Sequence, residues 1–199
     1  MTDLIPQAFP LPSDPAVASY NYVDIANGLG YAIYYAIVWR TETTSTYALI
    51  PTAEYSGITQ LDFGTYSFDT SVFNTQRTAK GNAFVSVCYV SNACPITTFN
   101  ITLYRVPVSG AAVAICSTAS ATLGCTNNVP EINSVQLPLT ETDFKVGEKL
   151  RLTIAASETG VASFGTDPAN RDGSTINPSS DDPPSTTVLK VGIPFKIDI

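Results

Sequence analysis

Turn-forming residues interrupt this sequence at short intervals from residue 20 onward, and this rhythm limits what the chain can fold into. The segments between the turns are rich in β-branched and aromatic residues, which favour strands. No segment keeps a helical apolar period over three turns. The pattern predicts an all-β protein, an antiparallel β-sandwich of jelly-roll type. The turns are expected at Asn27-Gly28, Ser56-Gly57, Gly81-Asn82, Ser109-Gly110, Asn127-Asn128 and Lys145-Val146-Gly147.

The expected strands share short length and turn residues at their ends. Two of them also show strict alternation, which predicts one buried and one solvated face: residues 149–154 and the C-terminal residues 189–199. Pro194 has no backbone N–H, so the last strand is expected at a sheet edge, or with the missing donor on an unpaired side. The full set is residues 31–40, 46–50, 59–68, 84–89, 97–106, 111–117, 134–139, 149–155, 161–164 and 187–197.

Two further segments, residues 31–39 and 84–90, are apolar at nearly every position. This pattern is typical of strands covered on both faces, by a second sheet and an arm or by a neighbouring subunit. The first segment is about half as long as the roughly 20 residues that a transmembrane helix needs. It is interpreted as a buried strand, and no membrane is expected as a partner.

Prolines recur through residues 1–19 and exclude a helix or a central strand there. The segment is therefore predicted to be an extended arm that lies over its own domain or a neighbouring subunit. A disordered tail is the alternative. The apolar side chains that would make the contacts of this assembly arm are Leu4, Ile5, Phe9 and Leu11.

The rest of the chain is expected to form a single unit. Residues 20–199 have the length of one all-β sandwich domain. Residues 165–185 lose the apolar character of the segments around them, so they are predicted to form a long polar surface loop.

The chain contains no histidine. Histidine is the commonest general base near neutral pH, a frequent metal ligand and the usual partner of serine and cysteine nucleophiles. Sites that depend on a histidine in any of these roles are therefore excluded. Charged residues make up 14% of the chain, against about 25% in typical soluble domains. A chain with so few charges and 44% hydrophobic residues is expected to bury part of its surface in an assembly.

The charges that are present are mainly acidic, with 17 Asp and Glu against 10 Lys and Arg and a net charge of -7. Phosphate backbones repel such a chain, so nucleic acid is not an expected partner. Residues 1–14 lack a basic stretch followed by an apolar one, so no secretory signal is recognised and synthesis in the host cytoplasm is expected.

The cysteines are Cys88, Cys94, Cys116 and Cys125. Their spacing is too wide for the CxxC pairs of zinc sites or thioredoxin-like motifs. Two local disulfides, Cys88 with Cys94 and Cys116 with Cys125, would close short loops once the protein leaves a reducing cytosol. Free, buried thiols are an equally good interpretation, and both alternatives stay open.

Acidic residues offer two weak candidates for a site. A glycosidase needs only a pair of carboxylates, but the spacing of Glu42, Glu54, Asp62 and Asp69 singles out no pair. The loop residues that could surround calcium do not match the EF-hand pattern, and such residues commonly form turns. These loop residues are Asp167, Asn170, Asp172, Asp181 and Asp182.

Aromatic residues near the start of the domain offer a third candidate, because aromatic rings could stack on sugars. Packing in a core or an interface explains them as well. They are Tyr20, Tyr22, Tyr31, Tyr34, Tyr35 and Trp39. Glycine-rich phosphate loops, G-x-S-x-G and H-E-x-x-H are absent from the sequence. We therefore expect no catalytic residues, no metal site and no cofactor.

Distinctive segments lie near both ends of the chain: residues 18–30 (ASYNYVDIANGLG), 144–154 (FKVGEKLRLTI), 167–173 (DPANRDG) and 193–199 (IPFKIDI). They resemble a group of virion structural proteins predicted from tailed double-stranded DNA phages and related environmental viruses. The resemblance implies a component of the virus particle and no catalytic residues. It also implies a capsid decoration or cement protein, a class that commonly forms trimers on the outer shell and clamps adjacent capsid subunits.

The expected function is therefore that of a non-enzymatic virion structural protein on the outer capsid surface. Its expected partners are the major capsid protein and further copies of itself, with a trimer favoured. A tail- or vertex-associated virion protein is one alternative, and the copy number per particle separates the two. A carbohydrate-binding β-sandwich module or glycosidase is a second alternative, and a small extracellular adhesin, which would need a leader sequence, is a third.

Overall fold

The computed structural model describes residues 29–40, 43–51, 60–62, 64–91, 97–123, 131–157, 162–165 and 189–196. The regular secondary structure of these residues consists of strands, with no helix among them, which confirms the all-β prediction. The strands are β1 (Leu29–Arg40), β2 (Ser45–Ile50), β3 (Gln60–Asp62), β4 (Thr65–Thr70), β5 (Arg77–Ser91), β6 (Thr97–Val106), β7 (Val113–Ala114), β8 (Ala119–Leu123), β9 (Glu131–Phe144), β10 (Lys149–Ser157), β11 (Ala162–Gly165) and β12 (Lys190–Lys196).

All of these strands belong to one 12-stranded sheet. Its order is β3-β11-β5-β12-β1-β2-β4-β10-β6-β7, while β8 pairs with β6 and β9 pairs with β5. The pairs are antiparallel except for β2 and β4, which run parallel with Ala48 opposite Asp69 and Leu49 opposite Thr70. The expectation of a purely antiparallel arrangement is therefore wrong at this one pair, and the sheet is mixed.

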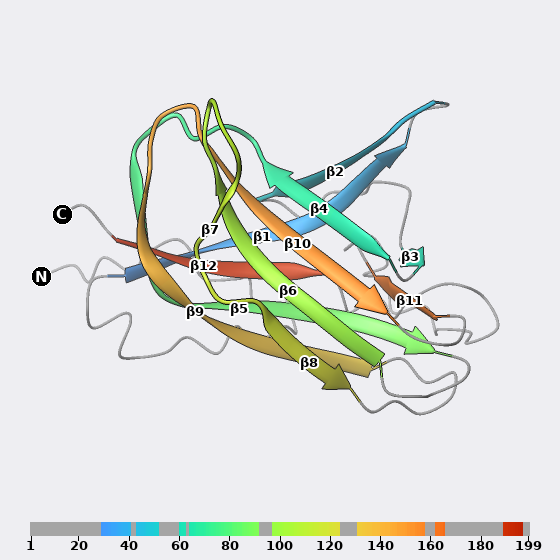
Figure 1. Cartoon of the computed structure of the whole chain (residues 1–199). Coiled ribbons are helices and arrows are strands. Elements are labelled where there is room, and N and C mark those ends of the chain that lie inside the picture. The colour runs from blue at the N-terminus through green and yellow to red at the C-terminus, as the bar shows by residue number, and fades with distance from the viewer. Residues whose placement is uncertain are drawn as a thin grey trace, which may run out of the picture.

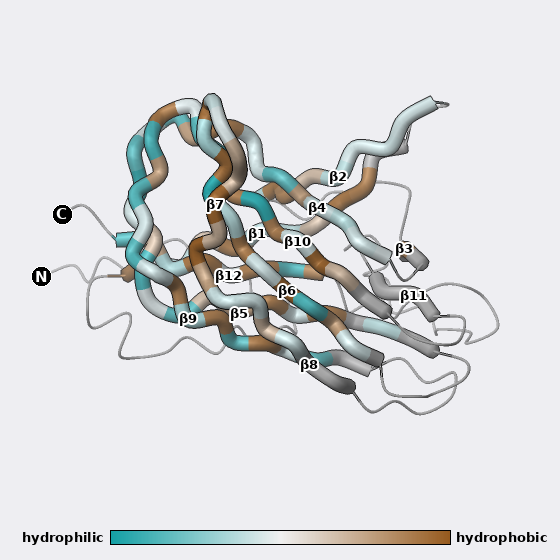
Figure 2. The backbone as a smooth tube through the Cα atoms, in the orientation of Figure 1, coloured by the Kyte–Doolittle hydropathy of each residue, from teal (hydrophilic) through white to brown (hydrophobic). Residues whose placement is uncertain are grey.

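The sheet curls back on itself and encloses one core. Figure 1 shows β4, β10 and β6 in front of β1, β12 and β5, and both groups of strands contribute to the same cluster of buried side chains. Figure 2 shows apolar and polar stretches following one another along these strands. Burying one large apolar side chain stabilises a fold by about 1.5–3 kcal/mol, so this cluster is the main source of stability. Its largest fully buried members include Phe68, Phe99, Phe144, Ile101, Leu103, Leu150 and Leu152.

The two alternating segments form strands whose apolar residues face the core as predicted. The other face of β12 is not solvated, because Pro194 is buried and Lys190 and Gly192 are half-buried. In β10, Leu150, Leu152 and Ile154 are fully buried, whereas Arg151 and Thr153 are half-buried on the other face. In and just before β12, Leu189, Val191, Ile193 and Phe195 are buried in the core cluster. Period-two alternation therefore places both strands against the core, as expected.

Pro194 lies in an interior strand, since β12 pairs with β1 on one side and β5 on the other. The edge-strand alternative is therefore wrong. The ladder between β12 and β5 is irregular between Gly192 and Phe195, and Pro194 lies inside this interruption. A residue without a backbone N–H is tolerated where the ladder is already broken. This agrees with the second alternative, in which the missing donor of Pro194 lies on an unpaired side.

Glycine residues explain two further differences from the expected strands. Gly81 was expected to form a turn, but it lies within the long strand β5 with a φ of 102°. The ladder between β5 and β9 shifts register there, between Ala79 and Gly81, so the glycine marks a β-bulge. Gly64 interrupts the strand expected over residues 59–68, which is divided into β3 and β4 in different parts of the sheet.

Three other strands differ from expectation in length or were missed. β9 extends well beyond residues 134–139 because it follows β5 along most of its length. β7 is only Val113–Ala114, shorter than residues 111–117. β8 was not expected, because its sequence ASATL is small and weakly patterned, and it forms by pairing with β6.

β1 is buried on both faces from Tyr34 to Val38, as its apolar sequence predicts, whereas Ala32 and Ile33 are half-buried. Ala36 and Val38 belong to the core cluster, whereas Ile37 is fully buried outside that cluster. Tyr31 reaches across β12, where its hydroxyl donates a hydrogen bond to the carbonyl of Asn82 at 3.0 Å. The same expectation for residues 84–90 holds only in part, because Val85, Val87 and Tyr89 are buried while Phe84 and Ser86 are half-buried.

The predicted arm, residues 1–19, and most of the predicted polar loop, residues 165–185, lie outside the described residues. Their arrangement and the single-domain organisation stay predictions. Among the residues that the structure describes, no helix has the length and apolar character needed to cross a membrane.

Candidate functional site

The loop between β4 and β5 is fixed on the turn between β9 and β10. The backbone N–H of Phe73 donates to the carbonyl of Glu148 at 2.9 Å, and the N–H of Gly147 donates to the carbonyl of Phe73 at 2.9 Å. The Phe73 ring is buried and makes edge contacts with Phe144 at 5.1 Å and Phe195 at 6.0 Å between ring centroids. Backbone and side-chain contacts thus anchor the loop of residues 71–76 at Phe73.

Arg77 follows this loop as the first residue of β5. Its Cζ lies 5.6 Å from the ring centroid of Phe73 and 5.6 Å from that of Phe195. Aromatic faces attract a guanidinium within about 6 Å of the centroid. The two rings therefore restrict the guanidinium although the residue is exposed.

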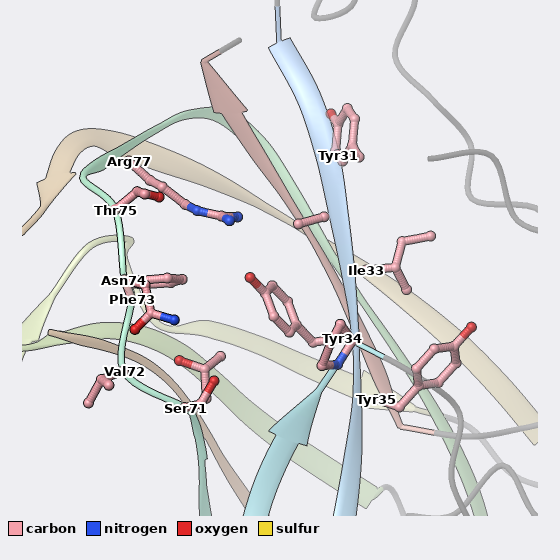
Figure 3. A pocket seen from close by; sticks show the side chains of 13 residues that line it. Tyr31, Ile33, Tyr34, Tyr35, Ser71, Val72, Phe73, Asn74, Thr75 and Arg77 are labelled. Atoms are coloured by element: carbon pink, nitrogen blue, oxygen red, sulfur yellow. The ribbon is translucent and has the colours of Figure 1, made fainter. Parts of the chain in front are cut away.

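A hollow of about 620 Å³ lies between β1 and this loop. Figure 3 shows the Tyr34 side chain extending from β1 toward Arg77 and the loop, whereas Ile33 and Tyr35 point to the other side of the strand. The Tyr34 side chain is 7% exposed, and no residue in the described part of the chain forms a hydrogen bond with its hydroxyl. The remaining lining residues are Tyr31, Ala32, Pro51, Thr70, Ser71, Val72, Phe73, Asn74 and Thr75.

Tyr34 is neutral at ordinary pH, and its burial in the hollow disfavours ionisation further. Burial raises the pKa of the Tyr34 hydroxyl above its ordinary value, and the positive charge of Arg77 lowers the pKa in part. Tyr34 is therefore a hydrogen-bond donor at neutral pH. Among the described residues that line the hollow, this donor is combined with the positive charge of Arg77, and none is acidic.

The carboxylates placed elsewhere in the structure are engaged with partners. Asp69 accepts two hydrogen bonds from Arg151, at 2.6 and 2.8 Å. Glu141 pairs with Lys80 at 3.1 Å and with Lys196, and both lysines lower its pKa through hydrogen bonds. These groups join neighbouring strands and are explained by the fold.

Three turns meet at the upper end of the molecule in Figure 1, and each of them carries an exposed valine. Val72, Val108 and Val146 are 46%, 75% and 63% exposed and come from the β4–β5 loop, the β6–β7 turn and the β9–β10 turn. A Cβ on Gly147 would lie 3.0 Å from Val108, and Gly147 donates its N–H to the β4–β5 loop, so the three turns are in contact. We call these residues the valine tip.

Cys116 is a free, buried thiol, as one of the two alternatives for the cysteines has it. Its Sγ accepts a hydrogen bond from the backbone N–H of Leu103 at 3.3 Å. Burial raises the pKa of the thiol, and this hydrogen bond lowers it in part. Because Cys116 is free, the structure does not contain the expected disulfide between Cys116 and Cys125. Cys94 and the side chain of Cys88 lie outside the described residues, so the disulfide between them stays a prediction.

We expect the Cys116 thiol to react slowly in the folded protein, because it is both shielded and held in its protonated form. Alkylation with iodoacetamide, followed by peptide mass spectrometry, should label Cys116 at least about tenfold faster in urea than in native buffer. Equal rates in both conditions would show that the thiol is accessible in the folded state.

The other candidates from the sequence are not brought together into a site. Of the four carboxylates considered for a glycosidase, Asp69 is paired with Arg151. Asp62 lies in β3, but its side chain is not described. Glu42 and Glu54 lie outside the described residues. Among the residues that the structure describes, no cluster of acidic or cysteine side chains has the arrangement of a metal site. The calcium candidates and the aromatic residues Tyr20 and Tyr22 are in segments that are not described.

The assembly-arm residues also lie outside the described part of the chain. The structure reveals two features that the sequence did not single out. These features are the hollow at Arg77 and the valine tip. No sequence pattern pointed to Arg77 as a binding residue, because Tyr34 and Phe195 are distant from it in the sequence. Val108 and Val146 did carry one, since each is an apolar residue in an expected polar turn.

Comparisons with known proteins give a fold but no family. The sequence matches no known protein family and no curated protein. A CocE/NonD family hydrolase from Staphylococcus aureus has a similar structure, with a TM-score of 0.63 and 11% sequence identity over 85% of this chain. The chain spans 37% of that hydrolase's length, and the likeness at this identity shows a shared fold alone.

Two other similar structures are weaker. An aminopeptidase from a marine sediment Thaumarchaeota archaeon has a TM-score of 0.49 at 8% identity, covering 85% of this chain and 33% of the aminopeptidase. A T13 particle of infectious bursal disease virus has a TM-score of 0.35 at 11% identity, covering 83% of this chain and 35% of that chain. Neither carries an argument about this protein.

Proposed function

We propose that this protein is a non-enzymatic structural component of a virus particle, a decoration or cement protein on the outer capsid surface. The observation that carries this proposal is the valine tip. Three turns that contact one another each expose a valine, and exposed apolar side chains grouped in this way are suited to a protein–protein interface. The tip would bind the major capsid protein and join this chain to the shell.

The fold suits a clamp between subunits. We propose that the curled sheet is a jelly-roll-like sandwich, because strands from its two parts bury side chains in one common core. Residues 20–199 would form this single domain, and the arm of residues 1–19 would reach a neighbouring subunit. Copies of the chain would assemble around a symmetry axis of the shell, with a trimer favoured.

The arm offers a direct test of this proposal. Removing residues 1–15 is expected to weaken binding to capsids of the same virus by about tenfold, equivalent to about 1.4 kcal/mol. The thermal unfolding temperature should stay within a few degrees, because the described core contains none of these residues. Co-sedimentation with purified capsids measures the binding. If the truncated chain binds as well as the full-length chain, the assembly role of Leu4, Ile5, Phe9 and Leu11 is wrong.

A tail or vertex position in the particle is the nearest alternative, and a copy number of only a few to dozens per particle would favour it. A carbohydrate-binding module is a second alternative, and the hollow with its tyrosine and arginine is the observation in its favour. Binding to neutral glycans on an array would support that alternative. If the Tyr34→Phe variant no longer bound these glycans, the glycan site would be the hollow.

A further inference from the structure

We propose that the hollow between β1 and the β4–β5 loop binds a carboxylate, held by the guanidinium of Arg77 and the hydroxyl of Tyr34. The carboxylate would belong to an acidic amino-acid side chain or to a sugar acid. This inference stands on the hollow alone and does not depend on the assignment to a virus particle.

The charge of Arg77 is the first argument. The chain carries a net charge of -7, yet no carboxylate among the described residues forms an ion pair with Arg77. By contrast, Arg151 is paired with Asp69, and Arg105 lies 3.8 Å from Glu148. A guanidinium presents parallel N–H groups that match the two oxygens of a carboxylate. Arg77 is therefore available to bind an anion from outside the described fold.

The position of the guanidinium is the second argument. The rings of Phe73 and Phe195, both 5.6 Å from Cζ of Arg77, limit the conformations of a side chain that is otherwise flexible. The backbone bonds between Phe73, Gly147 and Glu148 fix the loop that carries one of these rings. Binding groups that are ordered beforehand lose less entropy when the ligand arrives. The site is thus built before a ligand enters.

Tyr34 provides the third argument. Its side chain is more than nine-tenths buried and extends into the hollow, but its hydroxyl has no hydrogen-bond partner among the described residues. Because this hydroxyl borders the hollow, it can donate its proton to a ligand oxygen there. Ser71, Asn74 and Thr75 add further polar groups around the hollow. Its volume of about 620 Å³ is within the range of small-molecule sites.

The test is a titration of the full-length chain with small acidic and neutral compounds. Binding is monitored through the backbone amide NMR signals of Asn74 and Thr75. Two acidic probes, D-galacturonate and N-acetylglutamate α-amide, are compared with their neutral counterparts, D-galactose and N-acetylglutamine α-amide. At least one acid is expected to bind with a dissociation constant of about 1–10 mM and at least about tenfold more tightly than its neutral counterpart. The acid that binds more tightly identifies the source of the carboxylate.

Variants then assign the binding to the two side chains. Arg77→Gln should weaken the acid at least about tenfold, and Tyr34→Phe, which keeps the ring, should weaken it about threefold to tenfold. Lys145→Gln removes the same charge at an exposed turn position and should leave the affinity unchanged. If Arg77→Gln unfolds the protein, Tyr34→Phe decides the question.

The proposal is overturned if neither acid causes shifts at about 50 mM, a concentration well above the expected dissociation constant. It is also overturned if the neutral compounds bind as tightly as the acids, or if the affinity survives the Tyr34→Phe change. A Lys145→Gln variant that weakens the acid as much as Arg77→Gln would show attraction to net charge alone and would equally contradict the site.

Discussion

Replacing Phe144 with alanine is expected to lower the free energy of unfolding by about 3–5 kcal/mol, the range typical of deleting a buried aromatic ring. Phe144 is fully buried at the end of β9 and contacts Phe73 at 5.1 Å and Phe195 at 6.2 Å. Its loss would leave a cavity beneath the β4–β5 loop. Urea denaturation followed by circular dichroism measures the change. A loss smaller than about 1 kcal/mol would mean that the aromatic cluster is not packed as described.

Val146→Ala is the matched control for this change. It removes apolar atoms two residues away along the chain, but Val146 is 63% exposed. Its unfolding free energy should change by no more than about 0.5 kcal/mol. The contrast between the two variants separates burial in the core from any general sensitivity of the β9–β10 turn.

Replacing Val108 and Val146 together with aspartate is expected to weaken capsid binding by at least about 100-fold. Each valine that an interface buries contributes about 1.5 kcal/mol or more, and burying an unpaired carboxylate adds a desolvation cost. Both positions are exposed in the isolated chain, so its stability should change little. Co-sedimentation with capsids of the same virus gives the affinity. Unchanged binding of the double variant would remove the valine tip from the assembly surface.

The charge of that variant needs its own control. Asn133→Asp combined with Gln136→Glu also adds two negative charges with almost no change in shape. Both residues lie on β9, away from the turn that carries Val146. This control should bind capsids within about twofold of the original chain, since rim or remote charges contribute little to affinity.

The sequence was sufficient for the strands with a clear pattern. Alternation in residues 149–154 predicted which side chains of β10 face the core, because a period of two has only one interpretation when one face is buried. The apolar run in β1 likewise predicted burial on both faces. Glycine was ambiguous: Gly147 does form a turn with a φ of 87°, whereas Gly81 forms a bulge inside β5. Both glycines have a positive φ, so local sequence cannot separate them.

The candidate site could not be predicted from the sequence, because it is made by long-range contacts. Tyr34, Arg77 and Phe195 come from β1, β5 and β12, and only the strand order brings them together. The tyrosines were noticed for their aromatic rings, but the feature that matters at Tyr34 is a hydroxyl facing a positive charge. The valine tip depends in the same way on three turns that meet only in the folded chain.

The measurement that tests the central claim most directly is quantitative mass spectrometry of purified virus particles from the source of this sequence. It gives the number of copies of this chain per major capsid subunit. A lattice-bound decoration protein predicts a ratio between roughly one-third and one, as the symmetry of a shell with one trimer or one monomer per site requires. Absence of the chain from the particles would contradict its role as a virion component, and a ratio below about one in twenty would contradict its position on the capsid lattice.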